Sequence, residues 1–242
     1  MKITRNRQGV ALTYKVPAAK GRRLVVPDIH GCPETFTSLL ETIQLQERDQ
    51  LFLLGDYIDR GPSSSGVIDI IMKLQQQYSV YPLRGNHEQM LLDLCQNSPE
   101  QLRWARQYHG SGLLQQQKPA IKPVYLQFLQ DLPHYVALKD YILVHAGLNC
   151  SAPDPFQRLQ DLVWIRNFTN EPRVTGGRTI VHGHPPTSLP EIRHAIKTGS
   201  SIIPLDNGCV FASYRTDVGN LLCLDIDSRQ LYIQRNLTEI VI

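Results

Sequence analysis

Paired-cysteine motifs, long apolar runs and blocks of basic residues are all missing from this sequence. The five cysteines are odd in number and show no Cys-x-x-Cys spacing, which argues against a disulfide framework or a thiolate zinc site. No uninterrupted apolar stretch is long enough to span a bilayer, and residues 1–8 lack the apolar core of a signal peptide. The formal net charge of +3 is mild, so nothing demands a nucleic-acid polymer as partner. We therefore expect a cytoplasmic protein that binds neither membranes nor nucleic-acid polymers.

The composition is that of a chain with a sizeable hydrophobic core. Hydrophobic residues make up 42% of the 242 residues, and no low-complexity linker or internal repeat divides the sequence. We expect a single domain over residues 1–242. An anionic small substrate fits the mildly basic charge, and the sequence leaves the oligomeric state open.

The sequence is organised around the heptapeptide GDYIDRG at 55–61, which follows the apolar run LFLL at 51–54. The run is typical of a central strand, and the turn after it holds Asp56, Asp59 and Arg60. Burying two carboxylates this close together is costly unless a cation, or a partner such as Arg60, neutralises them. The turn therefore predicts a metal site. A capped helix start with a surface ion pair is the alternative.

Two further turns repeat this pattern. The run LVVP at 24–27 leads into DIHG at 28–31, and a strand predicted over 78–83 leads into RGNHE at 84–88. Each turn precedes apolar residues at helical spacing, so the order predicts βαβ units in a partly parallel sheet, with all three turns at one edge. Residues two apart on an extended chain point to the same side, so Asp28 and His30 can reach one ion. By the same rule, the neighbours Asn86 and His87 are expected to point apart.

The second half of the chain supplies more polar residues at strand ends. A hairpin predicted over 135–144 delivers His145, the run 179–181 delivers the sequence HGH at 182–184, and the run 202–205 delivers Asp206. Residues 210–214, 220–226 and 230–234 alternate in character and predict an antiparallel meander that forms a second sheet. Residues 98–133 do not follow the pattern of apolar runs and polar turns. We interpret this segment as a helical cap over the cleft or, equally, as a helical insertion that packs on the flank of the domain.

Five motifs occur in a fixed order: DxHG at 28–31, GDxxDRG at 55–61, GNHE at 85–88, HAG at 145–147 and GH at 183–184. One such motif is a weak signal, but five in series rarely occur by chance. The set resembles the calcineurin-like metallophosphoesterases of the phosphoprotein phosphatase branch, above all bacterial and phage serine/threonine phosphatases and their relatives that cleave diadenosine tetraphosphate. This resemblance implies an α/β fold in which two mixed β-sheets pack as a sandwich flanked by helices.

The resemblance also implies a centre of two divalent transition-metal ions. By motif position, Asp28 and His30 would bind the first ion, Asp56 would bridge both, and Asn86, His145 and His184 would complete the second. A bridging carboxylate holds two cations about 3.5–4 Å apart. Nitrogen and oxygen ligands without thiolate suit Mn²⁺, our first expectation, or Fe or Zn²⁺.

One position departs from the family pattern. Asn207 stands where relatives usually carry Thr in the sequence Asp-Thr-Gly, which leaves the role of Asn207 open.

The resemblance assigns the remaining polar residues to substrate. Arginines at the positions of Arg60 and, shortly after a tryptophan, Arg166 grip phosphate oxygens in the family, and Asn86 is also expected beside the substrate. A planar guanidinium suits a phosphoryl group that gains charge at its equatorial oxygens. His87, oriented by Asp59, is the expected general acid. We expect one-step hydrolysis, in which a hydroxide bridging the metals attacks phosphorus while His87 protonates the leaving oxygen.

The motifs leave two substrates open. The leading hypothesis is a phosphatase that acts on phosphoserine or phosphothreonine in proteins, with tolerance for small phosphoesters. The alternative is a hydrolase of diadenosine tetraphosphate or a similar dinucleoside polyphosphate, which would use the same residues on an anhydride. A non-catalytic phosphate-binding module is a third hypothesis, but all six expected ligands, both arginines and His87 are present.

Overall fold

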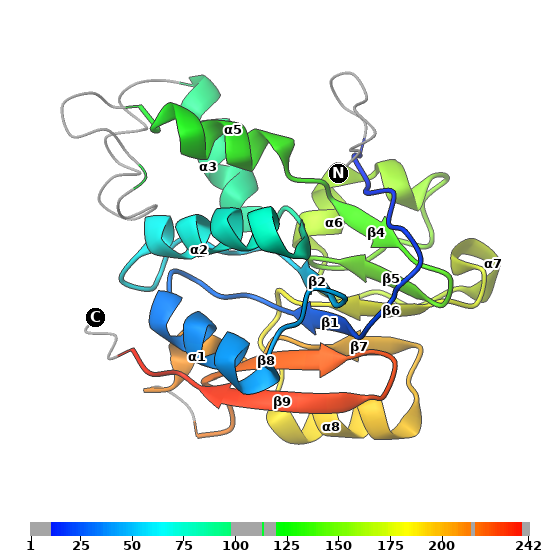
Figure 1. Ribbon diagram of the computed structural model, residues 1–242. Coiled ribbons are helices and arrows are strands. Elements are labelled where there is room, and N and C mark those ends of the chain that lie inside the picture. Colours follow the sequence, from blue (N-terminus) through cyan, green and yellow to red (C-terminus); the bar gives the residue numbers. More distant parts are fainter. Residues whose placement is uncertain (1–10, 98–112, 114–119, 214–215, 239–242) are drawn as a thin grey trace.

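Two mixed β-sheets pack face to face, and helices cover their outer faces (Figure 1). The structure is a computed structural model that describes residues 11–97, 113, 120–213 and 216–238. The expected sandwich of two mixed sheets flanked by helices is therefore confirmed. Among the described residues, no helix combines the length and the apolar character needed to cross a bilayer, and all five cysteines are free thiols.

The first sheet has five strands in the order β3-β2-β1-β8-β9. Its members are β1 (Arg23–Val26), β2 (Gln50–Leu53), β3 (Ser79–Pro82), β8 (Asn220–Asp225) and β9 (Gln230–Arg235). The first three strands are parallel, and they are connected by α1 (Pro33–Ile43) and α2 (Ser64–Gln77), with α3 (Asn86–Asn97) after β3. The predicted βαβ units are confirmed, and the three polar turns lie at one edge of this sheet.

Burial on both faces explains why β1 is central. Leu24 and Val26 pack with apolar residues of α1 and α2, whereas Val25 packs in the core between the two sheets. Residues of a strand alternate between faces, so a strand that is apolar at every position is stable only between two layers. Helix α1 begins with Pro33 in its first turn and buries Phe36 and Leu39 against the sheet, as its apolar spacing predicts.

The second sheet has the order β4-β5-β6-β7. Its strands are β4 (Tyr135–Ala137), β5 (Tyr141–Val144), β6 (Thr179–His182) and β7 (Ile202–Pro204). The first two form the predicted antiparallel hairpin, and β5, β6 and β7 are parallel. The remaining described helices are α5 (Pro123–Asp131), α6 (Leu159–Trp164), α7 (Pro172–Thr175), α8 (Leu189–Thr198) and the 3₁₀ helices η1 (Pro155–Gln157) and η2 (Cys209–Phe211).

The predicted C-terminal meander is wrong in two respects. Cys209–Phe211 form a 3₁₀ turn rather than a strand, because Gly208 adopts a left-handed conformation and its carbonyl accepts the Phe211 N–H. The β8–β9 hairpin does form, but it joins the first sheet, with β8 antiparallel to β1. Alternating apolar residues on β8 reach both the core under α1 and the core between the sheets, so this strand is stable beside β1. Alternation predicts a strand but does not choose its neighbour.

The cap predicted over 98–133 lies largely outside the described residues, which omit 98–112 and 114–119. Its described end contains α5, whose Tyr125 and Leu129 belong to the core under the first sheet. Figure 1 shows α5 beside α3 on this side of the molecule. The covering role of the segment stays a prediction.

Candidate metal centre and active site

Polar turns from both sheets meet at one edge of the sandwich. The expected ligands and the expected acid pair are all buried there, with none more than 7% exposed: Asp28, His30, Asp56, Asp59, Asn86, His87, His145 and His184. They come from the ends of β1, β2, β5 and β6 and from the first turn of α3. The structure thus brings together residues that lie up to 156 positions apart, as in the contact of Asp28 with His184.

Unusual backbone conformations are concentrated in these turns. Among the described non-glycine residues, seven have positive φ, and five of them are expected site residues: His30, Asp56, Asp59, Arg60 and His184. Such conformations persist only where the surroundings hold them. Here the first two turns hold each other, because the N–H groups of Ile29 and His30 donate to the Asp56 carbonyl at 3.1 and 2.8 Å.

Two motif glycines are explained by close approach of a carboxylate. A Cβ atom on Gly85 would overlap the Asp56 carboxylate, and one on Gly183 would overlap the Asp28 carboxylate. The glycines of the GNHE and GH motifs therefore leave room for the carboxylates of other turns.

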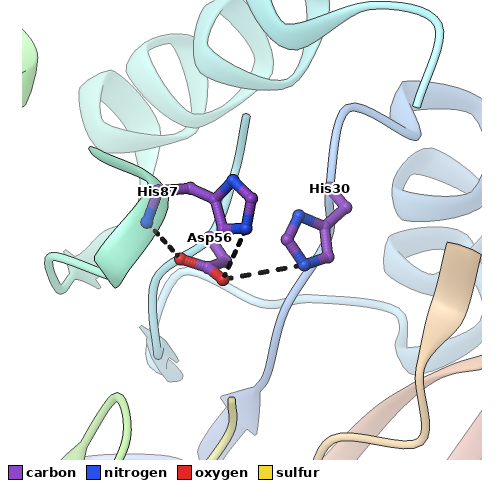
Figure 2. A group of neighbouring side chains, drawn as sticks. All are labelled: His30, Asp56 and His87. Carbon is purple, nitrogen blue, oxygen red and sulfur yellow. Dashed lines mark hydrogen bonds and ion pairs between the residues drawn. The ribbon is translucent and has the colours of Figure 1, made fainter. Parts of the chain in front are cut away.

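Asp56 lies between two groups of potential metal ligands, His30/Asp56/His87 and Asp56/His145/His184. Its Oδ2 is 3.6 Å from His30 Nε2, and its Oδ1 is 3.5 Å from His145 Nε2. Figure 2 shows the first group, in which the His87 backbone N–H also donates to Asp56 Oδ1. Burial acts to raise the pKa of Asp56, but the nearby imidazoles and this hydrogen bond hold it below its ordinary value. Asp56 is therefore an ionised carboxylate that can serve both groups.

The tautomers of two histidines leave lone pairs directed into the site. His30 Nδ1 lies 3.0 Å from the Ile58 carbonyl and His145 Nδ1 lies 3.0 Å from the Leu54 carbonyl, so the neutral rings carry their protons on Nδ1. Burial lowers the pKa of His30 to about 3 and also lowers that of His145. Metal-binding histidines have this arrangement, in which the second ring nitrogen donates to a backbone carbonyl.

The donor set fits a cation. His145 Nε2 lies 2.9 Å from Asn86 Oδ1, so two acceptors face each other beside the Asp56 carboxylate. The buried Nε2 of His184 has no hydrogen-bond partner among the described residues. A group of acceptors with too few donors is costly to bury unless a cation binds between them. The residues present are therefore those that a divalent transition metal would need.

Asp28 connects the first turn to the last. Its Oδ2 lies 4.0 Å from His30 Nε2, and both of its oxygens are 3.2 Å from the backbone N–H of His184. Burial, with the charges of Asp206 and Asp56, raises its pKa well above the ordinary value. A carboxyl in this setting is stabilised in its ionised form by a bound cation.

His87 forms the expected pair with Asp59. His87 Nδ1 lies 2.6 Å from Asp59 Oδ2, which leaves Nε2 on the side of the site, 3.9 Å from Asp56 Oδ2. The extended segment predicted for Asn86 and His87 is wrong, since both lie in the first turn of α3. Successive helical side chains diverge by about 100°, so Asn86 still reaches His145 while His87 reaches Asp59.

The two expected phosphate-binding arginines are exposed and lie at different places. Arg60 Nη1 is 2.8 Å from His30 Nε2, and its guanidinium carbon is 5.5 Å from the centre of the Phe211 ring. Arg166 lies beyond α6, near enough to His184 that its charge helps burial to lower the pKa of that imidazole to about 3. The Trp164 ring, at the end of α6, is 6.1 Å from the His184 ring.

Glu88 holds two of the turns together, a role that its place in the GNHE motif did not reveal. Its Oε2 accepts the N–H groups of Asp56 and Gly85, both at 2.9 Å, and its Oε1 accepts the Tyr57 N–H at 2.8 Å. Burial and the Asp56 charge raise the pKa of Glu88 to about 7. An acidic residue in the first turn of a helix is the signal that the sequence offered, and only the fold shows that Glu88 is buried and which groups it contacts.

Replacing Glu88 with glutamine should destabilise the protein by about 2–3 kcal/mol, because the amide nitrogen must face backbone N–H donors in either orientation. Chemical denaturation of the two proteins measures this difference. Glu41→Gln, the same change at an exposed position of α1, is the matched control and should alter the free energy of unfolding by less than about 0.5 kcal/mol. Equal stabilities for Glu88→Gln and the wild type would contradict this role for Glu88.

Asn207, which departs from the family pattern, holds the loop after β7. Its Nδ2 donates to the carbonyls of Thr187 and Asp217 at 2.9 and 3.1 Å, and its Oδ1 accepts from Asn220 Nδ2 at 2.6 Å. The neighbouring Asp206 is buried, accepts the Gly208 N–H at 2.7 Å, and has its pKa raised to about 7, chiefly by burial. The amide of Asn207 thus satisfies three backbone and side-chain groups of this loop.

Residues 21–210 match the family model described as calcineurin-like phosphoesterase, and the chain belongs to this family. Among curated relatives, it is 26% identical to a protein of Oceanobacillus iheyensis named asymmetrical bis(5'-nucleosyl)-tetraphosphatase, over 89% of this chain and 96% of the relative. It is 32% identical to a symmetrical bis(5'-nucleosyl)-tetraphosphatase of Nitrosomonas europaea, over 51% of this chain and 43% of that one.

Solved structures share the fold. One, titled a putative diadenosine tetraphosphatase, has a TM-score of 0.70 at 22% identity and covers 95% of this chain and 100% of its own. A protein serine/threonine phosphatase from Saccharomyces cerevisiae has a TM-score of 0.62 at 14% identity, with coverages of 92% and 82%. At these identities the likeness concerns the fold alone.

Proposed function

We propose that this calcineurin-like phosphoesterase hydrolyses dinucleoside polyphosphates such as diadenosine tetraphosphate. The observation that carries the substrate class is the similarity, over nearly the full length of both chains, to a relative named for that activity. This reverses the order of the two hypotheses drawn from the motifs, in which phosphoproteins came first. The motifs are shared by both kinds of enzyme, whereas similarity along the whole chain also includes the residues outside the motifs.

Calcineurin-like phosphoesterases use a dinuclear divalent metal site. In this chain, Asp28, His30 and Asp56 would hold one ion, and Asp56, Asn86, His145 and His184 would hold the other. We propose Mn²⁺, with Fe or Zn²⁺ as alternatives for the same nitrogen and oxygen ligands. When bound, two such ions neutralise phosphoryl oxygens and lower the pKa of water so that a nucleophile forms at neutral pH.

The chain's own groups would bind and protonate the substrate. Arg60 and Arg166 are exposed cations beside the two ligand groups, so they would bind phosphate oxygens from two sides. Burial lowers the pKa of His87, but the hydrogen bond to Asp59 and the charges of Asp56 and Asp59 raise it overall. His87 would therefore hold a proton on Nε2 near neutral pH and deliver it to the leaving oxygen.

The close contact of His87 with Asp59 supports phosphomonoesters as the second candidate substrates. A serine or threonine alkoxide is strongly basic and needs a proton as it leaves, whereas a phosphate leaving group is already stabilised as an anion. A well-positioned acid is therefore more useful on a phosphoprotein than on an anhydride. The same metals and arginines would serve both reactions.

Initial rates on two substrates test the proposal. The full chain reconstituted with Mn²⁺ should cleave diadenosine tetraphosphate at a higher kcat/KM than a phosphothreonine peptide, and a chelator should abolish both activities. A clear preference for the peptide would overturn the substrate proposed here in favour of a protein phosphatase. Absence of metal-dependent turnover on either substrate would overturn the proposed activity altogether.

A further inference from the structure

Arg60 donates a hydrogen bond to the nitrogen of His30 that is expected to bind a metal ion. Arg60 Nη1 lies 2.8 Å from His30 Nε2, and the other ring nitrogen of His30 is committed to the Ile58 carbonyl. A guanidinium can only donate hydrogen bonds, so the lone pair on Nε2 must be the acceptor. That lone pair can serve either Arg60 or a metal ion, but not both.

We propose that Arg60 and the first metal ion compete for His30 Nε2, so that metal binding there releases the Arg60 side chain toward the substrate. The inference rests on the metal centre proposed above and adds to it an order of events. Metal binding at His30 comes first and frees a cation, and the free guanidinium then binds phosphate oxygens. Substrate binding is thereby linked to occupancy of the first metal position.

The backbone around Arg60 confines this movement to the side chain. Asp59 and Arg60 have φ values of 68° and 65°, and the Asp59 N–H donates to Ser64 Oγ at 2.9 Å. The next residue, Gly61, packs against the His30 carbonyl so closely that a Cβ atom would overlap it. The Cα atom of Arg60 is therefore fixed beside the first ligand group, while its exposed side chain can change rotamer once the bond to His30 is broken.

The Phe211 ring provides a second contact that does not depend on His30. The guanidinium carbon of Arg60 lies 5.5 Å from the ring centre, within the range of a cation–π interaction. The Phe211 ring itself packs against Gly208, where a Cβ atom would be 2.9 Å from Phe211 Cδ2. An Arg60 side chain that loses its bond to His30 therefore keeps a contact at the edge of the site.

Metal titration of two arginine variants tests the competition without any turnover. Isothermal titration calorimetry with Mn²⁺ should show that Arg60→Met binds one of two equivalents about tenfold more tightly than the wild type does. The reason is that the ion no longer has to break the hydrogen bond from the charged Arg60 side chain to His30. Arg166→Met is the matched control. This variant also removes one positive charge, near His184, but leaves Arg60 bonded to the His30 lone pair. Its gain in Mn²⁺ affinity should therefore be clearly smaller than that of Arg60→Met.

Equal gains in Mn²⁺ affinity for Arg60→Met and Arg166→Met would show that the arginines weaken metal binding by charge repulsion alone, and would overturn the competition. If the wild type binds two equivalents and turns over substrate but Arg60→Met binds no more tightly, the competition fails and the proposed function stands. If neither the wild type nor Arg60→Met binds Mn²⁺, the competition and the proposed function fail together.

An NMR titration of the full chain with Zn²⁺ adds a direct readout of the competition. The Arg60 Nε–H signal should move as the first equivalent of Zn²⁺ binds.

Discussion

Replacing Asp56 with asparagine should lower kcat/KM about a thousandfold, since the carboxylate that we propose to bridge the two metal ions would be lost, and with it several kcal/mol of transition-state stabilisation. Asp56 is the only described residue shared by both groups of potential ligands. Its two oxygens lie 3.6 Å from His30 Nε2 and 3.5 Å from His145 Nε2. An amide in its place offers one neutral oxygen, so the second proposed ion would lose its only anionic ligand and the first would keep Asp28 alone. Metal analysis should find fewer than two equivalents per chain.

Stability separates this loss of metal from misfolding. The pKa of Asp56 lies below its ordinary value because nearby imidazoles and the His87 N–H stabilise its charge in the folded chain, so asparagine removes part of this stabilisation. In the presence of a chelator, Asp56→Asn should therefore still unfold cooperatively, at a somewhat lower temperature than the wild type. Asp140→Asn, in the exposed turn between β4 and β5, is the control for the same chemical change. Full metal content and full activity in Asp56→Asn would exclude the bridging role.

Replacing His87 with asparagine should affect substrates according to their leaving groups. The loss in kcat should reach about 10²–10⁴-fold on a phosphoserine peptide, which needs general-acid catalysis, and should be far smaller on p-nitrophenyl phosphate. Diadenosine tetraphosphate should follow p-nitrophenyl phosphate, because a phosphate anion leaves readily without a proton. The experiment compares kcat for the three substrates. Equal losses on all three would remove His87 from the acid role.

The pH profile gives this prediction a second readout. Interaction with Asp59 and Asp56 outweighs burial and raises the pKa of His87 above its ordinary value of 6.5. An acid must be protonated to act, so wild-type activity on the phosphoserine peptide should fall as pH rises through this raised pKa. Asp59→Asn removes the carboxylate whose Oδ2 lies 2.6 Å from His87 Nδ1, which lowers the pKa of His87. The fall in activity should therefore move to lower pH. An unchanged alkaline limb in Asp59→Asn would contradict the proposed pairing.

Local patterns in the sequence determined the elements and the kind of chemistry. Each of the first three strands was predicted from an apolar run, and each turn after it from Gly together with Asp or Asn, because strand burial and turn formation depend on neighbouring residues. Parallel βα units place successive turns at one edge, so the convergence of Asp28, Asp56 and Asn86 could also be predicted. The order of the five motifs indicated the family to which the chain belongs.

Only the tertiary structure decided the contacts between distant segments. The β8–β9 hairpin has the same alternation in either sheet, and its place beside β1 depends on which cores its two faces fill. Glu88 is one residue of a motif until the fold directs backbone N–H groups of the second turn toward it. The bond between Arg60 and His30 joins two turns whose approach depends on the packing of β1 against β2. Such contacts arise from the geometry of the whole sheet, which no local pattern in the sequence encodes.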